Sequence, residues 1–297
     1  MRKILVTGAS GFIGSAAARA LLAAGVEVHG TSASGRAGPP GVIMHRCDLL
    51  DDTAVADLLA ELRPSHLLHV AWDVTHGTYW TSPANFLWLA AGARLLERFL
   101  ALGGQRAVGV GSCAEYAWTE AETYTEVSSP LAPATPYGRC KLALSEGFAA
   151  AGMMGLSTAW ARLFFPYGPG DGEQRFIPSM LARLRAGEAF DTTSGIQRRD
   201  FIHIDDVGAA LAALTRSSVT GAVNIGTGEG VALREVALEL AASLGAEPGL
   251  LRFGALPIRP GDPLSLIADA SRLRHEVGFT SAISWREGLR RLSQPRG

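Results

Sequence analysis

The 297-residue sequence has few cysteines, few charged residues and no long apolar run. Its three cysteines include no Cys-x-x-Cys pair, which argues against disulfides and favours a reducing, cytoplasmic location. Charged residues make up 19% and the net charge is −1, so nothing points to nucleic acid as a partner. No stretch approaches the roughly 20 apolar residues of a membrane span, and the apolar run at the N-terminus is too short for a signal peptide. The seven histidines lack metal-ligand spacing, so we expect no metal site.

Short apolar segments alternate with helical patterns through the first half of the chain. Strand–helix–strand at this spacing predicts parallel pairing and an α/β, Rossmann-like doubly wound sheet with helices on both faces. The predicted strands cover residues 3–6, 26–30, 42–46, 66–70, 107–110 and 156–162. The predicted helices cover residues 14–24, 53–62, 85–102 and 137–151.

The composition changes after residue 165, where a loop rich in proline and glycine begins. We expect a dinucleotide-binding domain over residues 1–165, with later returns to the sheet around 196–226. Residues 166–195 and 227–297 are then a smaller C-terminal substrate-binding lobe. In this part the pattern predicts helices over 177–186, 233–243 and 271–277 and a strand over 223–225.

Three glycines follow the first predicted strand and open the first helix. Gly8 permits a tight turn, Gly11 lets the backbone approach a pyrophosphate, and Gly14 lets helix and strand pack closely. The helix N-terminus adds free N–H groups and the positive end of its dipole. This junction predicts that a dinucleotide is held by Gly8, Ser10, Gly11, Phe12, Ile13 and Gly14.

The end of the second strand indicates which dinucleotide binds. An acid there would hydrogen-bond the ribose 2′-hydroxyl of NAD, whereas an arginine suits the 2′-phosphate of NADP. The segment has no Asp or Glu but carries Ser32, Ser34 and Arg36, which bind phosphate well. We therefore predict NADP(H) as the cofactor, with NAD(H) as the alternative.

Tyr137 and Lys141 are four residues apart in a predicted helix, so they lie on one face, one turn apart. A tyrosine with its ordinary pKa near 10 is a poor acid–base catalyst at neutral pH. A nearby ammonium lowers that pKa, so this pair is suited to proton transfer.

The glycine spacing G-x-x-G-x-x-G and the Tyr-x-x-x-Lys pair resemble the extended branch of the short-chain dehydrogenase/reductase superfamily. This branch includes the NAD-dependent epimerase/dehydratase enzymes that modify sugar nucleotides, and the resemblance covers nearly the whole chain. It implies that Asp48 and Leu49 hold the adenine and that the loop with Ala71 and Trp72 runs along the cofactor. Asn85, near the start of the next helix, also matches.

The segment after the fifth strand resembles the family's catalytic segment. Ser112 stands four residues before Tyr116, and the resemblance implies that its hydroxyl binds the reacting oxygen beside Tyr137. Sugar-nucleotide 4,6-dehydratases carry an acidic pair directly after this residue, where Cys113 and Ala114 stand here. Glu115 is acidic but lies one residue beyond these two positions. Without a carboxylate to abstract a proton, dehydration is not expected.

Two late segments, 198–207 and 259–262, resemble family segments whose arginines grip the substrate's diphosphate. The resemblance implies this role for Arg199 and Arg259, and guanidinium groups suit it chemically. A structural salt bridge, to Asp200 or Asp262, is the alternative for each arginine. Phe165 stands where the family usually has an asparagine that helps to hold substrate.

These features predict an enzyme that uses NADPH to reduce a keto group on a nucleotide-linked sugar, of the 4-keto-6-deoxyhexose type. Three alternatives stay open: an NAD-dependent nucleotide-sugar 4-epimerase, a reductase of a non-nucleotide carbonyl compound, and a non-catalytic NADP-binding regulator. Family members often dimerise through a four-helix bundle. By analogy we expect a homodimer through residues 85–102 and 137–151.

Overall fold

A seven-stranded parallel sheet forms the centre of the computed structural model, which describes residues 2–294. Neighbouring strands follow the order β12-β7-β5-β4-β1-β2-β3, and every pair is parallel. The strands are β1 (Lys3–Thr7), β2 (Glu27–Ser32), β3 (Ile43–Arg46), β4 (His66–His69), β5 (Arg106–Ser112), β7 (Ser157–Leu163) and β12 (Gly221–Ile225). The predicted Rossmann-like α/β fold is confirmed.

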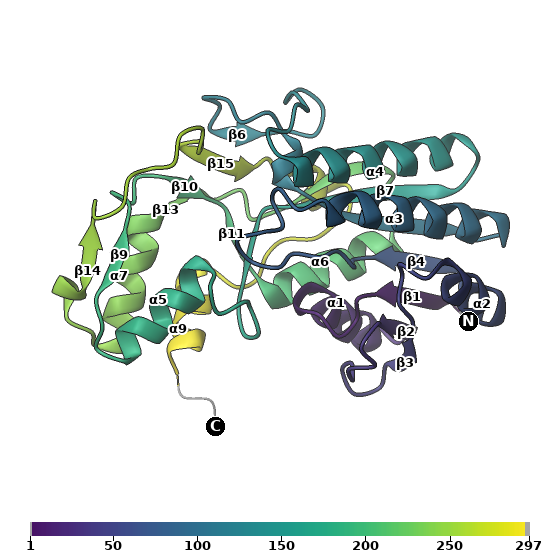
Figure 1. Ribbon diagram of the computed structural model, residues 1–297, viewed down its shortest axis with the longest axis horizontal. Helices are drawn as coiled ribbons and strands as arrows, with labels where there is room; N and C mark the ends of the chain where they lie inside the picture. The colour runs from purple at the N-terminus through teal and green to yellow at the C-terminus, as the bar shows by residue number, and fades with distance from the viewer. Residues whose placement is uncertain (1, 295–297) are drawn as a thin grey trace.

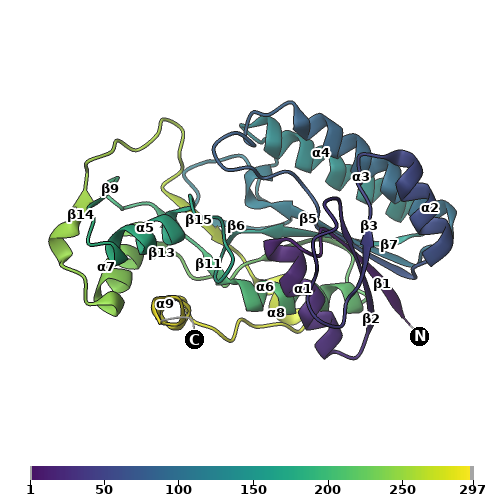
Figure 2. The ribbon, with the colours of Figure 1, turned by 60° about the horizontal axis from the view of Figure 1, so that its bottom comes forward.

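Helices cover both faces of this sheet because its strands are apolar on both sides. Ile4 and Val6 of β1 pack into one core with α1 and α6, whereas Leu5 packs into a second core with α2, α3 and α4. Figure 2 shows these two helical layers on opposite sides of the sheet. The helices are α1 (Phe12–Ala23), α2 (Asp52–Leu62), α3 (Ala84–Ala101), α4 (Pro136–Met153) and α6 (Ile204–Arg216).

A smaller group of elements with its own apolar core lies at the left of Figure 1. Met180, Leu240 and Trp285 are buried in that core and come from three different helices. The helices are α5 (Phe176–Arg185), α7 (Leu233–Leu244) and α9 (Trp285–Ser293), and β9 (Phe190–Thr192) pairs with β14 (Leu251–Phe253).

Short strands connect the two parts. A four-stranded sheet has the order β13-β10-β15-β6, and a separate pair joins β11 to β8. The strands are β6 (Thr123–Tyr124), β8 (Phe165–Tyr167), β10 (Arg198–Arg199), β11 (Phe201–His203), β13 (Val231–Ala232) and β15 (Ser265–Ala268). The remaining elements are η1 (Cys113–Glu115), η2 (Pro248–Leu250) and α8 (Ser271–His275). Within residues 2–294, none of the helices has both the length and the apolar character that crossing a bilayer requires.

Candidate active site

A cavity of about 690 Å³ lies at the carboxyl ends of the parallel strands, where doubly wound sheets build their sites. Gly8, Ser32 and Ser112 follow or end three of these strands and line one side. Arg175 and Asp262, from the later part of the chain, line the other side. The cavity is therefore bounded by both parts of the molecule.

The glycine loop forms the first wall of this cavity. Gly8 has a φ of 68°, and its carbonyl accepts a hydrogen bond from the Gly11 N–H at 2.9 Å. A Cβ at Gly14 would lie 2.1 Å from the Gly8 carbonyl oxygen, so only glycine lets α1 start this close to the loop. The first turn of α1 has no side-chain cap and no acidic residue. Its N–H groups fit a pyrophosphate, and the predicted Ser10, Phe12 and Ile13 also line the cavity.

The predicted ribose end of the cofactor site holds two serines. Ser32 and Ser34 line the cavity with their hydroxyl oxygens 3.4 Å apart. Arg36 is exposed and is not part of the cavity wall. Arg46 packs beside the same turn, since a Cβ at Gly35 would lie 3.7 Å from its Cδ. Sequence reasoning missed Arg46, although it comes directly before the Cys47–Asp48 segment.

Of the two residues predicted to hold the adenine, only Leu49 lines the cavity. Leu49 is buried and lines the cavity, as does Cys47. Asp48 is exposed, and its carboxylate accepts a hydrogen bond from the Leu50 N–H at 3.0 Å instead of lining the cavity. An apolar wall thus stands where the sequence indicated an acid.

The three predicted catalytic side chains lie at the same cavity. Ser112 ends β5, while Tyr137 and Lys141 belong to the first turns of α4. Thr135 caps α4, with its hydroxyl accepting the Gly138 N–H at 3.1 Å. A Cβ at Gly138 would lie 2.3 Å from the Ala114 carbonyl oxygen, so this glycine lets α4 pack against η1. This close packing brings Tyr137 to Ser112.

Burial dominates the electrostatics of these groups. It raises the pKa of Tyr137 well above its ordinary value, an effect that the nearby Ser112 hydroxyl opposes. It also lowers the pKa of Lys141 to about 7. The Lys141 ammonium donates to the Val110 carbonyl at 2.9 Å and lies 3.9 Å from the ring centre of Trp72. At neutral pH the tyrosine therefore keeps its proton, and burial outweighs the lowering of its pKa that the Tyr137–Lys141 spacing predicted.

An aromatic wall surrounds the ring of Tyr137. Tyr79, Trp80 and Trp72 meet it edge-on, with ring centres at 5.0, 5.5 and 6.4 Å. Asn85 fixes this wall: it accepts from the Trp72 indole N–H at 2.9 Å and donates to the Tyr79 carbonyl at 2.7 Å. The predicted Ala71 and three further aromatic residues also line the cavity, namely Trp88, Trp118 and Phe164.

The two predicted diphosphate arginines differ in position. Arg199 lines the cavity, donates to Asp262 Oδ1 at 2.7 Å and lies 5.5 Å from the ring centre of Phe165, which also lines it. Arg259 is exposed and is not part of the cavity wall. Arg199 thus forms the structural salt bridge with Asp262 that the sequence offered as the alternative to diphosphate binding.

Sequence reasoning missed an ion pair in the cavity wall. Asp171 Oδ1 lies 3.4 Å from Arg175 Nε, and the Asp171 side chain is 4% exposed. Burial raises the pKa of Asp171 to about 6. The loop after β8 was the available signal, because loops at the carboxyl ends of strands border such sites.

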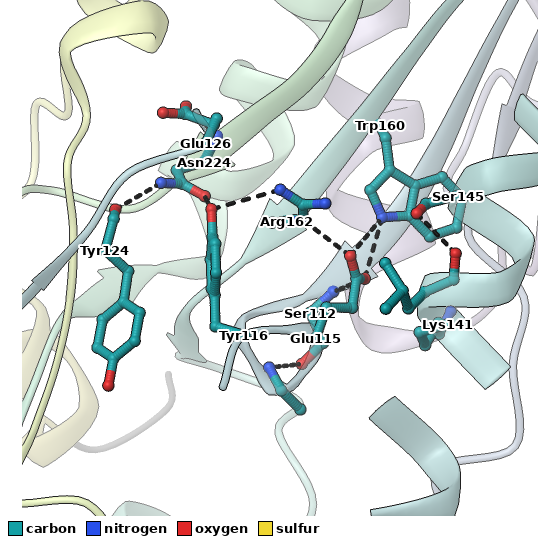
Figure 3. A network of polar contacts seen from close by, with 12 residues as sticks. Ser112, Glu115, Tyr116, Tyr124, Glu126, Lys141, Ser145, Trp160, Arg162 and Asn224 are labelled. Carbon is teal, nitrogen blue, oxygen red and sulfur yellow. Dashed lines mark hydrogen bonds and ion pairs between the residues drawn. The ribbon is translucent and has the colours of Figure 1, made fainter. Parts of the chain in front are cut away.

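The acidic residue closest in sequence to Ser112 faces away from the cavity. Glu115 is fully buried and pairs with Arg162 at 2.8 Å, as Figure 3 shows. Cys113 and Ala114 line the cavity and offer no carboxylate. The arrangement can donate a proton and polarise a carbonyl, and it has no carboxylate at the two positions directly after Ser112.

Comparison with known proteins gives consistent findings. Residues 4–226 match the NAD dependent epimerase/dehydratase family. The UDP-glucose 4-epimerase of Streptomyces lividans is 31% identical, over 93% of this chain and 91% of its own. The dTDP-glucose 4,6-dehydratase of Streptomyces griseus is 27% identical, over 96% of this chain and 91% of its own. The structure of the UDP-glucose 4-epimerase of Thermus thermophilus, solved with NAD, has a TM-score of 0.85 to this one. The two chains are 28% identical, and the match covers 97% of this chain and 96% of the epimerase.

Proposed function

This chain belongs to the NAD-dependent epimerase/dehydratase family, and we propose that it uses NADPH to reduce a keto group on a nucleotide-linked sugar. The observation that carries the proposal is the meeting of Ser112, Tyr137 and Lys141 at the cavity that the glycine loop also borders. The sugar we favour is a 4-keto-6-deoxyhexose.

In this reaction Tyr137 donates its phenolic proton to the carbonyl oxygen as that oxygen gains charge. Ser112 hydrogen-bonds the same oxygen and orients the carbonyl. Lys141, as an ammonium, favours the phenolate that is left behind. The hydride is supplied by the reduced nicotinamide cofactor when it is bound.

The cavity walls support a substrate with few hydroxyl groups near the reacting carbon. Trp80, Trp118 and Phe164 present apolar surface there, and Phe165 replaces an amide that would bind a hydroxyl. A methyl group suits such a wall better than a hydroxymethyl group, whose hydroxyl would lose its hydrogen bonds to water. Arg199 is the cavity-lining cation we assign to the diphosphate, exchanging its contact with Asp262 for the substrate.

The choice of NADP rests on the end of β2. Ser32 closes that strand, no acid follows it, and Arg46 packs beside the next turn. The similar epimerase from Thermus thermophilus was solved with NAD. Comparing KM for NADPH and NADH decides between them: a tenfold preference for NADH would overturn the assignment.

A second candidate is a nucleotide-sugar 4-epimerase, because epimerases are among the similar proteins and would use the same three side chains. We set dehydration aside, since Cys113 and Ala114 replace the acidic pair.

The deciding experiment incubates the protein with NADPH and a 4-keto-6-deoxyhexose linked to dTDP, CDP or GDP, and separately with UDP-glucose. Oxidation of NADPH equal to the alcohol formed supports the reductase. Isomerisation of UDP-glucose without net cofactor oxidation supports the epimerase. Cofactor binding without either reaction supports a regulator. Turnover that survives Arg199→Ala points to a substrate without the diphosphate.

We also propose a homodimer through α3 and α4. Phe86 and Leu87, adjacent at the start of α3, are 66% and 58% exposed, and a partner's helices would cover them. A monomer in sedimentation equilibrium at micromolar concentration would refute it. The three cysteines are free and buried, which suits the reducing cytoplasm we propose as its location.

A further inference from the structure

One buried carboxylate behind the cavity has no part in the mechanism above. Glu115 ends η1, and its side chain is 0% exposed. Its Oε1 accepts a hydrogen bond from the backbone N–H of Ser112 at 2.8 Å and so completes the capping box of η1. Glu115 therefore fixes the main chain of the residue whose hydroxyl meets Tyr137.

The other bonds of Glu115 hold the carboxylate in one orientation. Arg162 Nε donates to Oε2 at 2.8 Å, and the indole N–H of Trp160 lies 3.0 Å from both oxygens. A Cβ at Gly111 would lie 2.2 Å from Glu115 Oε1, so a glycine is needed for the carboxylate to lie against β5. Figure 3 shows Glu115 between Ser112 and this Arg–Trp pair. The wall behind the site is thus built around one buried ion pair.

We propose that Glu115 is a positioning residue: it fixes Ser112 opposite Tyr137, and its carboxylate, which binds β5 two residues from the carbonyl that binds Lys141, favours the ammonium form of Lys141. This inference rests on the proposed function only for the roles of Ser112, Tyr137 and Lys141. The contacts of Glu115 stand independently of the substrate.

The charge effect follows from what surrounds Lys141. Its direct partners, the Val110 carbonyl and the Trp72 ring, are neutral, while burial favours the uncharged amine. The titratable groups around the Tyr137–Lys141 pair come from β4, the loop after it, and η1: His69, Tyr79, Cys113 and Glu115.

Of these groups, Glu115 is the one whose contacts suit a negative charge. Burial raises the pKa of Glu115, but Arg162, the Ser112 N–H and the Trp160 N–H all donate to its carboxylate and oppose that rise. Burial lowers the pKa of His69 to about 3, so that imidazole is neutral, and burial raises the pKa values of Tyr79 and Cys113 to about 12. Glu115 raises the pKa of Lys141 against the effect of burial. Its removal should shift Lys141 toward the neutral amine.

The chain offers a direct test, because it has only two lysines, Lys3 and Lys141. In protein labelled with ¹³C-lysine, NMR follows the titration of both side chains without any substrate. Two variants are compared with the wild type, Glu115→Gln and Arg162→Gln. Each variant removes one partner of the same buried ion pair, so both should lose stability. An effect that differs between them therefore does not come from lost stability.

The two variants should move Lys141 in opposite directions. Glu115→Gln removes a negative charge and leaves Arg162 unpaired, so the midpoint of Lys141 should fall by about half a pH unit or more. Arg162→Gln leaves the carboxylate without its counter-charge, so the midpoint should rise. The Lys3 signal should titrate as in the wild type in both variants.

Turnover gives the second measurement, with NADPH and the nucleotide-linked keto sugar of the previous section. Glu115→Gln should lower kcat at pH 7 by about tenfold with little change in KM, because Ser112 binds the reacting oxygen and Lys141 favours the Tyr137 phenolate. Arg162→Gln should retain more activity, since Glu115 still holds Ser112.

Midpoints that stay unchanged, or move in the same direction, would overturn the proposal and leave Glu115 a structural residue only. If Glu115→Gln does not fold, Arg162→Gln decides alone: a raised midpoint supports the proposal and an unchanged one overturns it. A wild type that shows the titration but reduces no keto sugar would refute the proposed function and leave the charge effect standing.

Discussion

Gly138→Ala tests whether close packing of α4 on η1 sets the catalytic geometry. The added methyl group would lie 2.3 Å from the Ala114 carbonyl oxygen and 2.8 Å from Pro133 Cβ. Normal contact requires the two elements to separate by about 1 Å, which costs about 1–3 kcal/mol of unfolding free energy. At this chain length the melting temperature should fall by roughly 2–5 °C. Since Tyr137 moves with α4, kcat should fall about 100-fold.

Gly147→Ala in the same helix is the matched control. Nothing lies within 4 Å of a Cβ built there, so the substitution should raise helix stability by about 0.5–1 kcal/mol and leave kcat unchanged. Thermal melts by circular dichroism and NADPH oxidation measure the two quantities. If Gly138→Ala melts and turns over like the wild type, the close approach does not position Tyr137 and the reasoning fails.

Three further predictions concern the cofactor, the proton donor and the cavity wall. Tyr137→Phe should lower kcat at least ~100-fold while the Kd for NADPH, measured by fluorescence titration, stays within about twofold. Arg46→Ala should raise KM for NADPH about tenfold and leave KM for NADH unchanged, and equal effects on both would contradict a 2′-phosphate contact. Because burial raises the pKa of Asp171 from 3.8 to about 6, its folded form favours the proton. The wild type should lose about 3 kcal/mol of stability relative to Asp171→Asn as pH rises from about 3 to 7. If the free energies of urea unfolding of the two proteins depend on pH in the same way, Asp171 does not titrate as described.

The strands and first helices could be predicted because burial on both faces leaves a continuous apolar signal. The end of β2 shows where that signal fails. Thr31 and Ser32 look like the start of a turn, yet both are buried and pair with His45 and Arg46 of β3. Pairing with a neighbouring strand extended β2 by two residues, and a single-strand pattern does not contain that information.

Helix α6 was not predicted, although Asp205 and Asp206 in its first turn are a helix-start signal. From segment 198–207 we predicted only the role of Arg199 and no helix. In the active site, Arg199 and Arg259 show the same limit of a local sequence pattern, which does not contain contacts with distant segments. Both match a motif, but Arg199 lies on β10, is buried at the cavity and pairs with Asp262, whereas Arg259 lies in an exposed loop. A motif alone does not contain these contacts.

Four of the six tryptophans line a single cavity, and they are Trp72, Trp80, Trp88 and Trp118. Indole emission responds to nearby polar and absorbing groups, so the intrinsic fluorescence of this protein should report mostly on what enters that space. Ligand screening would then need no label, and a compound that leaves the emission unchanged can be set aside before any kinetic assay.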